Sequence, residues 1–83
     1  MFGSSNQLLE RLCALDAVTS RGFAFERLGN GDILVHRRGH AYGIWQTRVD
    51  GYRYIPAGKH EPSHVTGSAG EVFDITTQML KDR

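Results

Sequence analysis

The sequence predicts a small α+β domain, in the order α-β-β-β(-β)-α, whose antiparallel meander sheet carries two amphipathic helices on one face. Three observations predict it. Apolar residues recur with helical spacing near both ends of the chain, they alternate with a period of two in the middle, and turn signals separate the alternating runs. Consecutive hairpins leave no room for the crossovers of about a dozen residues that parallel pairs need. With 83 residues, we expect one domain spanning residues 1–83.

The first element is predicted as a helix from about residue 5 to residue 19. Its apolar stripe consists of Leu8, Leu12 and Leu15. The stretch SSNQ at residues 4–7 fits a capping box, and Gly22 follows where a C-terminal glycine is common.

The middle of the chain is predicted as strands joined by tight turns. The alternating runs are FAFERL, DILVHR, AYGIWQTRV and YRYIP. Asn30-Gly31, Gly39 and Asp50-Gly51 mark the turns between them, because these residue types tolerate a positive φ.

The last part of the chain is predicted as a loop and a second helix. Two prolines argue against central-strand pairing in the loop, residues 56–64. The helix is expected from about residue 69 to residue 81, with Ser68 and Glu71 as a capping box. Its apolar stripe consists of Val72, Ile75 and Met79.

The last hairpin divides its side chains between two faces. A two-residue turn at Asp50-Gly51 pairs Val49 with Tyr52 and Arg48 with Arg53. One face then holds Trp45, Thr47, Val49, Tyr52 and Tyr54; the other holds Ile44, Gln46, Arg48, Arg53 and Ile55. Either the rings lie under the helices as core, with the arginines on a solvated outer face, or they form an exposed platform beside basic residues.

The function expected from these features is non-enzymatic binding. The leading hypothesis is contact with a protein partner or a second copy of the chain, through the sheet surface or through an edge strand such as FAFERL. The alternative is nucleic-acid binding, because residues 21–60 hold seven Lys and Arg against three Asp and Glu. The candidate binding residues are Trp45, Arg48, Tyr52, Arg53, Tyr54, Arg37 and Arg38.

The order of helix, strands and helix resembles that of the double-stranded RNA-binding domain. That family sets lysines at the start of its second helix. Here the corresponding stretch, GSAGEVFD, holds Glu71 and Asp74 and no lysine. The chain is therefore not assigned to that family.

Other chemistries find little support in the sequence. Cys13 is the single cysteine and is expected to be a small buried apolar group of the first helix. The four histidines, His36, His40, His60 and His64, are expected on the surface, and no metal or other cofactor is predicted. We expect no signal peptide, no membrane span and a cytoplasmic location.

Overall fold

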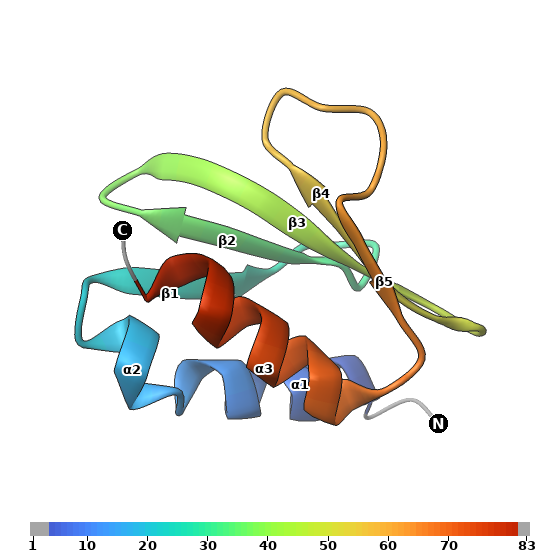
Figure 1. Ribbon diagram of the computed structural model, residues 1–83, viewed down its shortest axis with the longest axis horizontal. Coiled ribbons are helices and arrows are strands. Elements are labelled where there is room, and N and C mark those ends of the chain that lie inside the picture. Colours follow the sequence, from blue (N-terminus) through green and yellow to red (C-terminus); the bar gives the residue numbers. More distant parts are fainter. Residues whose placement is uncertain (1–3, 82–83) are drawn as a thin grey trace.

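Five antiparallel strands form one sheet in the order β1-β2-β3-β4-β5, and the helices lie against one face of it (Figure 1). The computed structural model describes residues 4–81, with side chains described from residue 7. The strands are β1 (Phe23–Arg27), β2 (Ile33–Arg37), β3 (His40–Arg48), β4 (Gly51–Pro56) and β5 (His64–Thr66); the helices are α1 (Ser4–Cys13), α2 (Asp16–Thr19) and α3 (Ala69–Leu80). The predicted α+β meander with helices on one face is confirmed.

The predicted first helix is interrupted, which corrects its single span of residues 5–19. Leu15 has extended backbone angles, φ −79° and ψ 90°, and separates α1 from α2. Asp16 then lies in the first turn of α2, where a carboxylate favours a new helix N-terminus. The break leaves Cys13 exposed, contrary to the burial expected for it, while Val18 is fully buried. The predicted cap at residues 4–7 involves side chains outside the described ones.

The first two hairpin turns lie where glycine predicts them. Gly31 has φ 91° in the turn between β1 and β2. Between β2 and β3, Arg38 and Gly39 both have positive φ, 54° and 80°. Arg37 pairs with His40 across this two-residue turn. His36 therefore pairs with Ala41. A three-residue loop would instead have placed His36 opposite His40.

The third turn differs from the prediction by one position. Arg48 pairs with Gly51, so the turn residues are Val49 and Asp50. Gly51 instead opens β4 with φ 143°, where an added Cβ would lie 2.6 Å from the carbonyl oxygen of Thr66. The glycine is needed for the close approach of β5 and not for the turn. The strands slide by two residues relative to the expected pairing, so every side chain keeps its predicted face.

A fifth strand extends the sheet beyond the prediction. The expected loop of residues 56–64 ends in β5, which pairs with β4 through Tyr52–Thr66 and Tyr54–His64. Ser68 then caps α3, accepting a hydrogen bond from the backbone N–H of Glu71 at 3.4 Å, as predicted. The carboxylate of Glu71 accepts instead from the hydroxyl of Thr66, and the backbone N–H of Ser68 donates to that hydroxyl at 3.2 Å, so only the Ser68 half of the predicted capping box forms. The apolar core between the layers consists of Leu8, Leu12, Val18, Phe23, Phe25, Ile33, Val35, Trp45, Tyr54, Val72 and Leu80.

Candidate functional site: the open face of the sheet

Two of the rings predicted to bind a partner lie inside the core. Trp45 is 0% exposed, and its Nε1 donates to Oγ1 of Thr76 on α3 at 3.0 Å. Tyr54 is 4% exposed, and its ring lies 5.2 Å from that of Trp45. Tyr52 is half-buried and packs on the same core. The helices therefore cover the ring face, which decides between the two arrangements that the sequence left open.

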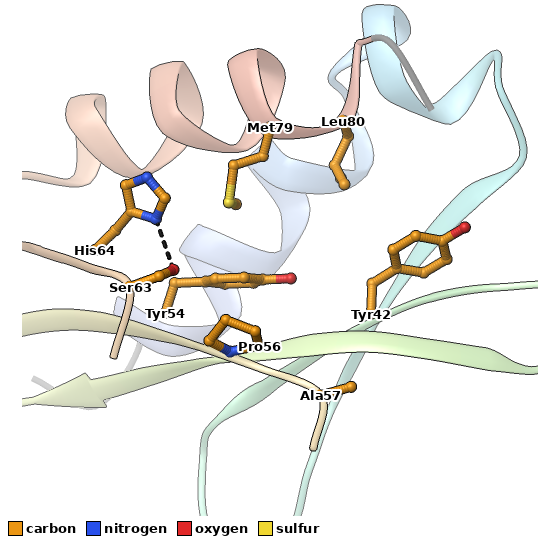
Figure 2. A pocket seen from close by; sticks show the side chains of 8 residues that line it. All are labelled: Tyr42, Tyr54, Pro56, Ala57, Ser63, His64, Met79 and Leu80. Carbon is orange, nitrogen blue, oxygen red and sulfur yellow. Dashed lines mark hydrogen bonds between the residues drawn. The ribbon is translucent and has the colours of Figure 1, made fainter. Parts of the chain in front are cut away.

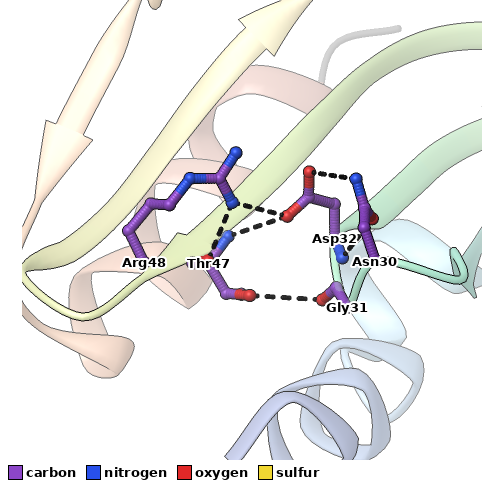
Figure 3. A network of polar contacts seen from close by, with 5 residues as sticks. All are labelled: Asn30, Gly31, Asp32, Thr47 and Arg48. Carbon is purple, nitrogen blue, oxygen red and sulfur yellow. Dashed lines mark hydrogen bonds and ion pairs between the residues drawn. The ribbon is translucent and has the colours of Figure 1, made fainter.

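Arg48 is held by a buried carboxylate (Figure 3). Its Nη1 donates to Oδ1 of Asp32 at 2.9 Å and to the carbonyl of Thr47 at 2.9 Å. Asp32 also accepts from the backbone N–H of Thr47 at 3.3 Å and from Nδ2 of Asn30 at 3.2 Å. The side chain of Asp32 is only 4% exposed, against 41% for Arg48. This network ties the β1–β2 turn to the end of β3, a structural role that sequence reasoning did not find.

The other three candidate arginines have different surroundings, although Arg37 and Arg38 are consecutive in the chain. Arg37 stacks on the ring of Phe23, 4.5 Å from its centroid, and donates to the hydroxyl of Tyr42 at 3.0 Å. Arg38 is exposed in its turn. Arg53 contacts Asp50 at 3.5 Å, in an exposed pair of the kind that contributes little to stability. Because Gln46 lies opposite Arg53, the two predicted facing arginines are not cross-strand partners.

The face of the sheet away from the helices (Figure 1) is here called the open face, and three apolar residues lie at its centre. Leu34, Ile44 and Ile55 are direct neighbours on β2, β3 and β4. All three are half-buried, and the helices α1, α2 and α3 all lie on the other side of the sheet. Val65 on β5, opposite Arg53, is 66% exposed.

Charged and polar side chains surround this apolar centre. Its edge consists of Glu26, His36, Gln46, Arg48 and Arg53. Glu26 pairs with Leu34 across the two strands. Oε1 of Glu26 lies 3.8 Å from Nε2 of His36. An apolar centre within a polar rim is the usual composition of a protein-binding surface. Ile44 and Ile55 were assigned to the arginine face by the sequence, but their contact with Leu34 was missed because it depends on the pairing of β2 with β3.

A separate pocket of about 280 Å³ lies between α3 and the end of β4 (Figure 2). It is lined by Tyr42, Tyr54, Pro56, Ala57, Ser63, His64, Met79 and Leu80. Ser63 Oγ and His64 Nδ1 lie 2.9 Å apart, a contact between sequence neighbours in an exposed segment. Within residues 7–81 no carboxylate forms an ion pair with His64, although Asp74 lines a neighbouring pocket of about 370 Å³ together with His64.

A metal site or a membrane-spanning helix in the described part of the chain would indicate a different kind of function. Within it, no three His, Cys, Asp or Glu side chains gather closely enough to hold a metal ion. None of the helices α1 to α3 has the length and apolar character required to span a bilayer.

The fold and this surface together define a small α+β domain with one face of its sheet uncovered. Comparison of the chain with family models, with curated proteins and with solved structures found no match.

Proposed function

We propose that this protein is a non-enzymatic interaction module that binds another protein surface through its open face. The observation that carries the proposal is the row of Leu34, Ile44 and Ile55 on three adjacent strands, with no helix over it. Val65 on β5, opposite Arg53, adds an exposed apolar side chain to the same face. Covering these side chains removes apolar area from water, which favours association by about 25 cal/mol per Å² before the costs of binding.

The rim of the open face favours a protein over a nucleic acid as its partner. The basic residues there stand beside acids: Arg48 beside Asp32, and Arg53 beside Asp50. Glu26 adds a third carboxylate, and phosphate groups are repelled by such charges. The rings that would stack on bases, Trp45 and Tyr54, lie in the core. The fitting partner is a folded surface with an apolar strip and charges of both signs.

Site-specific photo-crosslinking in cells tests the proposal. A benzophenone amino acid replaces Val65, which is exposed on the open face, and in a matched variant it replaces Glu10, which is exposed on α1. We expect defined protein adducts, identified by mass spectrometry, from position 65 and not from position 10. No adduct from position 65, or the same adducts from both positions, overturns the proposal.

A further inference from the structure

We propose that the surface covering the open face is that of a second copy of this chain, related to the first by a two-fold axis parallel to the strands. The inference rests on the proposed function and names its partner. Association of identical surfaces requires that each charge meets its opposite when the surface is turned onto itself. The positions of Glu26 and Arg53 meet that requirement.

These two charges lie on opposite sides of the apolar centre. Glu26 is on the edge strand β1, next to Leu34, and Arg53 is on β4, two residue pairs beyond Ile55. Both side chains are accessible, 66% exposed for Glu26 and 42% for Arg53. Their contacts within the chain are long, 3.8 Å from Glu26 to His36 and 3.5 Å from Arg53 to Asp50. Such exposed pairs are easily replaced by a better one across an interface.

The direction of the axis follows from where these charges meet. An axis parallel to the strands, between β2 and β3, places β1 of one copy over β4 of the other and Leu34 over Ile44. Glu26, which is level with Leu34 and Ile44, then lies over Ile55 of the partner. Arg53 is two residues further along that strand, and its long side chain can span this offset between sheets about 10 Å apart. An axis across the strands would instead bring β1 over β1, so that the two Glu26 carboxylates oppose each other. Charge complementarity selects the first arrangement.

Net charge and size set the strength of this contact. The formal net charge of +1 gives two copies little overall repulsion. Four strands of each copy overlap in this arrangement; spaced about 4.8 Å apart, with about five residues each rising 3.3 Å, they give a footprint of about 14 by 17 Å. Because a stable interface buries about 800 Å² on each partner, a patch of this size implies a weak dimer.

Sedimentation equilibrium of the full chain between about 10 μM and 1 mM tests the inference. We expect a monomer–dimer equilibrium that Glu26→Arg or Arg53→Glu weakens at least about tenfold, because each single change sets like charges against each other. The doubly exchanged variant restores the opposite pair and is expected within about threefold of the original. Glu10→Arg makes the same change of charge on the helical side and leaves the equilibrium unchanged. Far-UV circular dichroism checks that each variant is folded.

The possible results separate this inference from the function it rests on. A monomer throughout the concentration range, single variants that dimerise as the original does, or a double variant that does not recover would each overturn self-association. If position 65 then crosslinks to a different protein, the binding function stands with another partner. If position 65 gives no adduct and the chain is monomeric, both proposals fail.

Discussion

The indole Nε1 of Trp45 donates a hydrogen bond to Oγ1 of Thr76, 3.0 Å away, and that hydroxyl donates in turn to the carbonyl of Val72 at 2.7 Å. Trp45 and Thr76 are both 0% exposed, so water cannot replace either contact. The pair joins the third strand of the sheet to the last helix and gives the ring face its fixed position under α3. Stability at this point depends on a hydroxyl as well as on apolar packing.

We expect Thr76→Val to lower the free energy of unfolding by about 1–3 kcal/mol, because it leaves the buried indole N–H without an acceptor. Valine keeps the shape and the branching at Cβ, so neither cavity nor helix propensity explains the loss. The control is Thr77→Val, since Thr77 also donates to a carbonyl four residues back, that of Phe73 at 2.9 Å. It is expected to change stability by no more than about 0.5 kcal/mol. Urea denaturation measures both, and equal losses would contradict the role of the indole.

Gly43 is a position in the core where there is no room for a larger side chain. A Cβ there would lie 2.3 Å from the phenolic oxygen of Tyr54 and 2.9 Å from the carbonyl oxygen of Ile55. We expect Gly43→Ala to cost about 1–3 kcal/mol, because both the ring and the neighbouring strand must shift. Gly29 has no atom within 4 Å of the same added carbon, so Gly29→Ala is the matched control. Thermal unfolding should show a lower Tm for the first variant alone; a normal Tm for Gly43→Ala would mean that the ring does not lie against the glycine.

The carboxylate of Asp32 supports the base of two hairpins. Asp32→Ala removes the acceptor for the backbone N–H of Thr47 and for the guanidinium of Arg48. The expected loss is about 1–3 kcal/mol, at the lower end because Arg48 is 41% exposed and can turn to water. Asp50→Ala, which removes an exposed carboxylate with one 3.5 Å contact, is expected to stay within about 0.5 kcal/mol. If urea denaturation gave the two variants the same stability, the network would be a surface feature only.

The sequence predicted the meander because its signals are local. Alternation and glycine turns depend on neighbouring residues, and the faces of the last hairpin stayed correct because a slide of two residues preserves the alternation of side chains. The errors lie where distant parts of the chain compete with local preference. Gly51 is used for the approach of Thr66, which moves the turn to Val49 and Asp50.

The candidate site was predicted only in part, for the same reason. Arg48 and Arg53 lie on the outer face, as one of the two arrangements required, but their carboxylate partners depend on how the hairpins pack. Leu34 joins the apolar centre only through the pairing of β2 with β3. Apolar residues on the outward positions of three strands could have suggested this face, had the register of β2 on β3 been known.

Binding to nucleic acid is expected to be absent at physiological salt. The open face offers mixed charges, and the rings of Trp45 and Tyr54 are enclosed, so neither the counterion release nor the base stacking that such binding requires is supplied. Fluorescence polarisation of labelled single-stranded and double-stranded oligonucleotides checks this at low and at physiological salt. Weak binding at low salt that disappears as salt rises, and that Arg38→Ala and Arg53→Ala reduce no more than Lys81→Ala does, fits non-specific attraction by surface cations. Micromolar binding that persists at physiological salt and falls about tenfold in Arg53→Ala, but not in Lys81→Ala, would instead make the basic rim a nucleic-acid site.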